Sequence, residues 1–229
     1  MKSLQKSYEF LRELIQTLVL SVQDTRFFKL VVFVNSLVPL VLLGWDAAHQ
    51  RLGANPLEFA TRTTGMLALV FLTLSLAVTP LRKLTGWNWL GKFRRMVGLY
   101  AFFYAFLHLL TYVWFDRFFN PKSILLDTLA RPFVAVGMTA FLILIPLAVT
   151  STNKMVKRLG GRRWNRLHKA AYVAAALGVL HFYMLVKSDT RLPIAFGFAL
   201  ALLLVYRLVK AYTPPPNPKT PVRTLIPPR

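Results

Sequence analysis

One stretch without charged side chains decides the fold. Residues 96–115 read MVGLYAFFYAFLHLLTYVWF, and His108 is the only side chain among them that titrates near neutral pH. A helix needs about 20 predominantly apolar residues to cross the hydrocarbon core of a bilayer, so this run predicts a transmembrane helix. The composition agrees: 55% of the 229 residues are hydrophobic and 16% are charged, whereas soluble domains carry about 25% charged residues.

Further apolar runs lie on both sides of this stretch, and together they predict an all-α, polytopic transmembrane bundle with six spans. The spans are Phe27–Trp45, Thr64–Leu81, Met96–Phe115, Pro132–Thr150, Ala170–Val186 and Leu192–Val209. Lys29 and Arg207 lie inside two of these spans and are expected to snorkel to the interface. The bundle therefore occupies residues 27–212, and no internal sequence repeat is evident within it.

The two ends of the chain have a different composition. Residues 1–26 place apolar side chains at three- and four-residue steps, which predicts an amphipathic helix, lying either on the membrane surface or on the loops of the bundle. Residues 213–229 are rich in proline, and we expect a disordered or polyproline-like tail.

Orientation follows from the lysines and arginines, which in short loops favour the cytoplasmic side of a membrane. Of these 29 residues, 22 lie in the N-terminal segment, the second loop, the fourth loop and the tail, and 7 lie in the other three loops. The first group is therefore predicted to face the cytoplasm. With six spans, both ends of the chain are then cytoplasmic.

Composition also excludes several functions. The net charge of +21 would suit nucleic acid, but the basic residues sit in short loops, as expected beside anionic lipid. The chain contains no cysteine, which excludes iron–sulfur clusters and covalently attached c-type haem. No glycine-rich nucleotide-binding motif is visible, so the chain shows no nucleotide-binding domain of its own.

Two histidines within the spans are the candidate functional residues, because ionisable groups are costly inside a membrane. His108 lies 13 residues after Arg95, and His181 lies 13 residues after His168. Since 13 residues rise about 20 Å in a helix, His108 and His181 are expected at one depth, in the outer half of the membrane. They can bracket a non-covalent haem, or each can be a structural histidine bonded to a neighbouring helix, and spacing alone leaves both interpretations open.

His168 is expected nearer the cytoplasm, at the level of Arg94 and Arg95, where the third span offers no second histidine. Thirteen residues also turn an ideal helix by roughly 140° from the starting face. His168 and His181 therefore face different partners unless the helix is irregular. Arg94, Arg95, Arg62 and Arg131 are candidates for pairing with haem propionates, although each also serves as an ordinary topology-determining charge.

Several motifs give the chain a family resemblance. They are RRMVGLY at residues 94–100, LHL at 107–109, RP at 131–132, TST at 150–152, WNRLH at 164–168 and HFY at 181–183. With these motifs in this order, the chain resembles the MsrQ (YedZ) family, the haem-binding membrane subunit of a bacterial periplasmic protein-methionine-sulfoxide reductase system. It is similar, more distantly, to ferric-reductase-type transmembrane domains. The resemblance covers about residues 44–190.

The resemblance implies one or two b-type haems, with His108, His168 and His181 as the haem-linked histidines, and FMN as a further cofactor. It also implies a multi-pass protein of the bacterial inner membrane that passes electrons from the quinone pool to a soluble periplasmic molybdopterin reductase. Such a subunit would not reduce methionine sulfoxide alone. Two other functions stay open: a stand-alone ferric-reductase-like oxidoreductase, and a transporter or scaffold whose histidines only pack.

Overall fold

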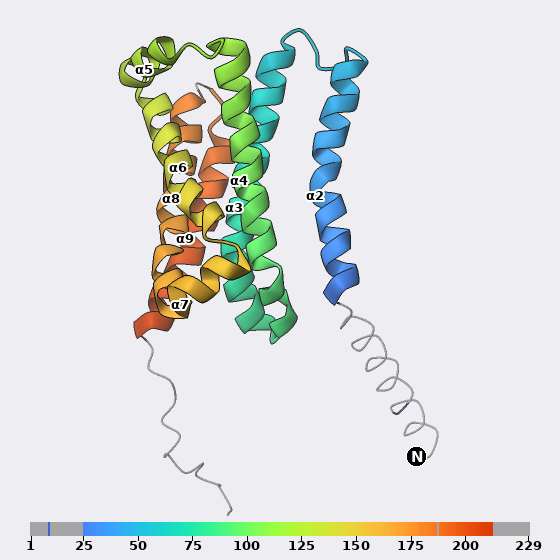
Figure 1. Cartoon of the computed structure of the whole chain (residues 1–229), viewed down its shortest axis with the longest axis vertical. Coiled ribbons are helices and arrows are strands. Elements are labelled where there is room, and N and C mark those ends of the chain that lie inside the picture. Colours follow the sequence, from blue (N-terminus) through green and yellow to red (C-terminus); the bar gives the residue numbers. More distant parts are fainter. Residues whose placement is uncertain (1–8, 10–24, 187, 213–229) are drawn as a thin grey trace, which may run out of the picture.

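A computed structural model describes residue 9 and residues 25–186 and 188–212, and the regular structure of these two ranges is helical throughout (Figure 1). The helices are α2 (Thr25–Ala48), α3 (Pro56–Thr85), α4 (Arg94–Thr111), α5 (Pro121–Ala130), α6 (Pro132–Val149), α7 (Asn153–Leu167), α8 (Ala170–Leu185) and α9 (Arg191–Tyr212), with a 3₁₀ segment η1 (Asn88–Lys92) and a π-helical segment η2 (Tyr112–Asp116). The predicted amphipathic helix and proline-rich tail lie outside the described residues, apart from residues 9, 25 and 26.

The predicted polytopic bundle is confirmed. Among the described residues, five helices are long and apolar enough to cross a membrane: α2, α3, α4 with η2, α6 and α9. The sixth predicted span corresponds to α8, which is apolar but has only 16 residues. At the helical rise these cover about 24 Å, so α8 reaches across the bilayer only with help from the residues at its two ends.

The second membrane helix begins eight residues before the predicted span, at Pro56 instead of Thr64. Asn55 caps it by accepting a hydrogen bond from the backbone N–H of Glu58 at 3.1 Å, and proline suits the first helical position because it has no N–H to satisfy. Glu58 and Arg62 then pair at 2.7 Å. These two charged residues lie in the turns of α3 that precede the predicted span, which is why the apolar run alone did not include them.

Two helices occupy segments that the sequence analysis treated as loops. Figure 1 shows α5 and α7 at opposite ends of the bundle. The Asn120 side chain accepts from the N–H of Ser123 at 3.1 Å to begin α5, and the Thr152 hydroxyl accepts from Met155 at 3.3 Å to begin α7. The α7 end carries many cations, whereas every acidic residue within 25–186 and 188–212 lies at or near the α5 end.

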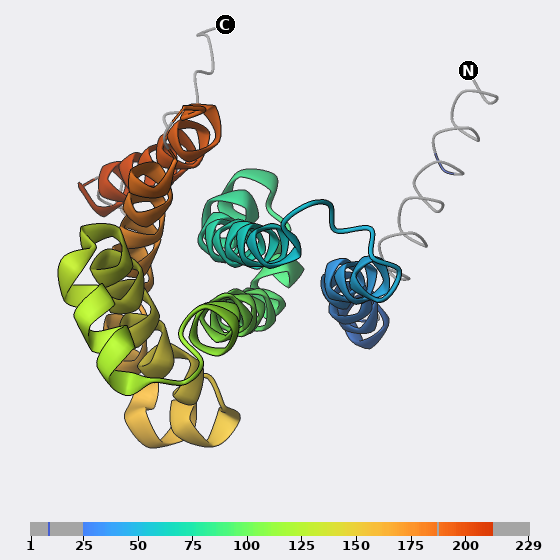
Figure 2. The same ribbon diagram turned by 90° about the horizontal axis from the view of Figure 1, so that it is seen from above.

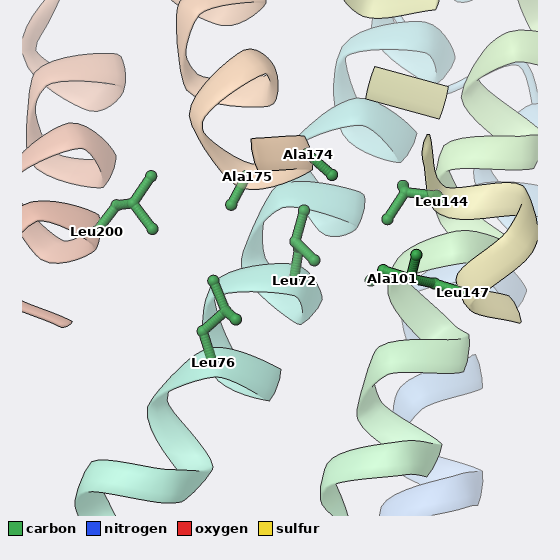
Figure 3. Packing of buried hydrophobic residues seen from close by; sticks show 8 residues of the cluster. All are labelled: Leu72, Leu76, Ala101, Leu144, Leu147, Ala174, Ala175 and Leu200. Carbon is green, nitrogen blue, oxygen red and sulfur yellow. The ribbon is translucent and has the colours of Figure 1, made fainter. Parts of the chain in front are cut away.

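The core joins two pairs of helices. α3 packs mainly on α4, α6 packs mainly on α8, α9 lies along α8, and contacts between the pairs are fewer. Small side chains bring the backbones close, as is usual between membrane helices. Figure 3 shows the buried cluster they form with leucines: Leu72, Leu76, Ala101, Leu144, Leu147, Ala174, Ala175 and Leu200.

The first membrane helix, α2, stands at the edge of the bundle in both views (Figures 1 and 2). Two tyrosines of α4 hold it there. The Tyr100 hydroxyl donates to the carbonyl oxygen of Phe33 at 2.9 Å, and that of Tyr104 donates to Ser36 at 2.6 Å. The other apolar side chains of α2 are largely exposed, as suits a helix surrounded by lipid.

Candidate functional site

His108 packs against the backbone of α3. Its Nδ1 lies 2.8 Å from the carbonyl oxygen of Thr61; because a carbonyl only accepts, Nδ1 carries the proton and donates. The imidazole ring rests on Gly65 of the same helix, where an added Cβ would come within 2.9 Å of Nδ1. Only glycine at position 65 leaves room for the ring.

His181 makes the same contacts on the other helix pair. Its Nδ1 donates to the carbonyl oxygen of Phe133 at 2.7 Å, and its ring rests on Gly137 of α6, where a Cβ would come within 2.7 Å of Nδ1. In both pairs the accepting carbonyl belongs to the residue four positions before the glycine. This repeated contact has no counterpart in an internal sequence repeat.

Sequence reasoning missed both glycines as site residues. A signal for them exists: Gly65 and Gly137 each stand near the start of a predicted span, and the next span in each case carries a histidine near its end. In an alternating bundle these positions lie at the same level. A glycine at that level leaves space for an imidazole, which a larger residue would fill.

The two histidine rings meet between the helix pairs. Their centroids are 6.0 Å apart and their planes are inclined by 77°, so the expectation of equal depth is met. Each Nδ1–H is held by a carbonyl, which leaves the Nε2 lone pair of each ring free. Among the described residues, neither Nε2 has a hydrogen-bond partner.

This donor set fits an axially ligated macrocycle. With a metal–nitrogen bond of about 2 Å on each side, two imidazoles on opposite faces of one metal have centroids roughly 6 Å apart. Within 25–186 and 188–212, no three His, Asp or Glu side chains gather as they would to hold a bare metal ion. Two imidazoles suffice only if the ligand supplies the remaining donors itself, as haem does.

His168 lies at the other end of the bundle, where α7 ends and α8 has not yet begun. This break resolves the rotational difficulty, because the helix is interrupted and both His168 and His181 can face α6. The Nε2 atom of His168 is 3.1 Å from the Thr150 hydroxyl at the C-terminal end of α6. Burial, together with the charge of Arg94, lowers the pKa of His168 to about 4, so the ring is neutral at pH 7.

A cavity of about 220 Å³ opens beside His168. Arg94, Arg95, Trp164 and His168 line its polar part, so the structure brings together the residues that the sequence placed at one level. Leucine side chains of α3 and α6 line the rest. The cavity combines one imidazole, two guanidinium groups and an apolar wall, which suits a flat, anionic ligand.

Arg62 and Arg131 are not free to bind an anion at the outer end. Arg62 pairs with Glu58, and Arg131 pairs with Asp127 at 3.0 Å. Asp127 was not singled out from the sequence because it lies in the segment treated as a loop. Its buried carboxylate also accepts from Arg117 at 2.9 Å and from the Tyr112 hydroxyl at 2.7 Å, and so fastens α5 to the helices on either side.

Comparison with known proteins places these residues in a family context. A family model described as "Ferric reductase like transmembrane component" matches residues 64–179. The chain is 52% identical over 186 residues to the protein-methionine-sulfoxide reductase heme-binding subunit MsrQ of Herminiimonas arsenicoxydans, covering 80% of this chain and 85% of the relative. It is 51% identical over 183 residues to the MsrQ of Rhodospirillum rubrum (80% and 88% covered) and 44% identical over 186 residues to that of Caulobacter vibrioides (81% and 88% covered).

Proposed function

Because this chain belongs to the MsrQ family of haem-binding subunits, we propose that it binds haem between His108 and His181 and carries electrons across the membrane for the repair of oxidised methionine. The observation that carries the proposal is the pair of free Nε2 atoms on two rings whose centroids are 6.0 Å apart. The relatives named above are described as haem-binding. Since the chain has no cysteine, the haem is not attached through thioether bonds, and we take it to be of the b type that the family resemblance implies.

The residues around the rings prepare the two ligands. Thr61 and Phe133 accept the Nδ1 protons, which fixes the tautomer and the orientation of each imidazole and raises its basicity. Gly65 and Gly137 let each ring lie against a helix backbone. When bound, haem supplies reversible one-electron transfer between ferric and ferrous iron. The packed helices around the rings exclude water.

The inner cavity is the second part of the proposal. His168, Arg94 and Arg95 hold a second cofactor there, either a second b-type haem with a non-histidine ligand or FMN. A second haem would be held more weakly than the haem between His108 and His181, because only one imidazole is present. When bound, this cofactor would supply an electron carrier on the cytoplasmic side of the site formed by His108 and His181.

The partners follow from the family and from the charge distribution. The donor is a quinol or a flavin reductase, since no nucleotide-binding motif is visible in the chain. The acceptor is a periplasmic molybdopterin subunit that reduces methionine sulfoxide, and the chain itself resides in the bacterial inner membrane with both ends in the cytoplasm. Alone, the purified chain does not reduce methionine sulfoxide.

A visible absorption spectrum of the detergent-purified protein tests the proposal. We expect a haem Soret band and a low-spin component that disappears in His108→Ala and equally in His181→Ala. His49→Ala is the matched control, because His49 is exposed near the end of α2 and bonds only to Trp45 of its own helix. A colourless, folded protein would instead favour a transporter or scaffold with structural histidines.

A second candidate function rests on the ferric-reductase-like match over residues 64–179. In that case the chain would reduce an external metal ion without a protein partner. Reduced protein in nanodiscs separates the two functions. We expect that the periplasmic methionine-sulfoxide reductase subunit oxidises the haem of the reduced protein and that chelated ferric ion does not.

A further inference from the structure

The side chain of Arg207 packs on a neighbouring helix. Its guanidinium lies over the ring of Tyr172, with Cζ 4.6 Å from the ring centroid. Nε and Nη2 of Arg207 are buried and have no hydrogen-bond partner among the described residues. The hydroxyl of Tyr172 is buried and unpartnered in the same way.

Three unpaired polar atoms on two touching residues require an explanation, because leaving a buried donor unsatisfied is costly and an unpaired buried charge is more so. The ring of Tyr172 offsets part of the cost through its π-face, but it accepts no hydrogen bond from Nε or Nη2 in the plane of the guanidinium. No carboxylate within 25–186 and 188–212 lies at this end of the bundle. A single anion could accept hydrogen bonds from all three atoms.

The location indicates where this anion comes from. Tyr172 directly follows Ala171, which lines the inner cavity, and Arg94 on the cavity wall lies within electrostatic range of both His168 and Arg207. Arg94 and Arg95 of α4 line the cavity, whereas Arg207 and Tyr172 lie next to its lining residues without being part of them. We propose that Arg207 and Tyr172 bind the oxyanion group of the cofactor seated in the inner cavity, through two N–H donors and one O–H donor.

Two chemistries supply such a group: the propionate carboxylates of a haem and the phosphate of a flavin mononucleotide. This inference rests on the second part of the proposed function, the cofactor in the inner cavity. It adds a residue of α9 to that site, although no sequence motif in α9 indicates a cofactor ligand. It does not depend on His108 and His181, whose ligand lies at the other level of the bundle.

Paired ligands that differ only in the anionic group test the inference on the full-length protein in phosphatidylcholine nanodiscs. The probes are haem against haem dimethyl ester, and FMN against riboflavin, with absorbance and flavin-fluorescence titration as readouts. We expect the wild-type protein to bind one anionic member roughly ten- to a hundredfold more tightly than its neutral partner, as charge-assisted hydrogen bonds normally contribute. The pair that shows this preference identifies the source of the anion.

Variants test whether Arg207 and Tyr172 cause the tighter binding of the anionic probe. Arg207→Met should abolish most of this preference for the anionic probe, Tyr172→Phe should reduce it, and Arg207→Lys should retain part of it. Lys210→Met is the matched control, because Lys210 is an exposed cation one turn further along α9, and it should keep the full preference. Since Arg207→Met removes two buried N–H groups that have no hydrogen-bond partner among the described residues, the variant without cofactor should melt no lower than wild type.

Equal preferences in wild type and Arg207→Met, for both pairs of probes, would overturn the inference. The inference would also be overturned if native mass spectrometry showed that Arg207→Met loses only a bound anionic phospholipid, while the variant still prefers the anionic member of each probe pair. The low-spin component of His108 and His181 is read in the same samples. Its absence from the wild-type protein would contradict the proposed function, and the flavin pair would still decide the role of Arg207.

Discussion

The imidazole ring of His168 lies face to face with the indole ring of Trp164, with centroids 3.8 Å apart and planes inclined by 25°. Both rings are tied to Thr150. Trp164 Nε1 donates to the Thr150 carbonyl at 2.9 Å, and the Thr150 hydroxyl donates to Pro146 at 2.6 Å. If that hydroxyl donates to Pro146, it accepts from His168, and Nε2 of His168 then carries a proton where Nε2 of His108 and His181 does not.

This difference in tautomer predicts separate spectral behaviour for His168. Substituting His168→Ala should leave the low-spin haem component of His108 and His181 largely intact while altering any second component, because roughly 20 Å of helix separates the two levels. Electron paramagnetic resonance of the oxidised protein distinguishes the components. If His168→Ala and His108→Ala abolish the same component and His181→Ala spares it, the assignment of ligands by depth is wrong.

Thr150→Val extends this test without removing the imidazole. It deletes the hydroxyl that accepts from His168 but keeps the size of the side chain, so Nε2 loses the partner that holds its proton. We expect the inner component to change in intensity or potential and the outer component to stay as in wild type. The measurement is a potentiometric titration followed by absorbance, with Ser151→Ala as the control at the adjacent position.

Replacing the glycines that contact the two histidine rings should lower the haem content, although the same replacement normally stabilises a helix. Alanine normally stabilises a helix by up to about 1 kcal/mol relative to glycine, yet Gly65→Ala and Gly137→Ala should each remove the outer haem component. The added Cβ would come within 2.9 and 2.7 Å of Nδ1 of His108 and His181. Gly44→Ala in α2, where a Cβ meets nothing within 4 Å, should keep the full haem content per purified chain.

The orientation of the bundle is open to a direct measurement. The bias of 22 basic residues against 7 predicts that a reporter fused after Arg229 is active only if it works in the cytoplasm. A reporter inserted into the Phe118–Asn120 segment before α5 should behave in the opposite way. Activity of a periplasm-dependent reporter at Arg229 would contradict the arrangement with both ends inside.

Much of the fold could be predicted from the sequence, because lipid imposes a simple rule: each apolar run long enough to cross must be a helix. The spans around His108 and His181 were found in this way, and their equal depth followed from the helical rise alone. α5 and α7 were missed because their signals are local caps, Asn120 with Pro121 and Thr152, which hydropathy does not weigh.

The site was harder to predict where it depends on packing between helices. Nothing in the spacing of His181 names Phe133 as its acceptor, since the contact depends on how α6 and α8 cross. Arg207 was expected at the interface because long cationic side chains near helix ends usually reach water. Its contact with Tyr172 was not predicted, because that contact depends on the packing of α9 against α8, which sequence periodicity does not determine.

Asp127 provides a last prediction, on stability. Its carboxylate, 8% exposed, accepts from Tyr112, Arg117 and Arg131, and Arg131 directly precedes α6, whose residue Phe133 holds His181. Breaking a buried ion pair by removing one partner commonly costs about 3–5 kcal/mol. Because Arg131 is half exposed, we expect roughly the lower end, about 3 kcal/mol, for Asp127→Asn. A lowered melting temperature in detergent and a broadened outer haem signal would report this loss of stability.

Asp116→Asn is the control for Asp127→Asn, since Asp116 is 49% exposed and, among the described residues, pairs with Arg117 alone. The control variant should melt close to wild type. If Asp127→Asn also melts with the wild type, Asp127 does not hold the outer end of the bundle together.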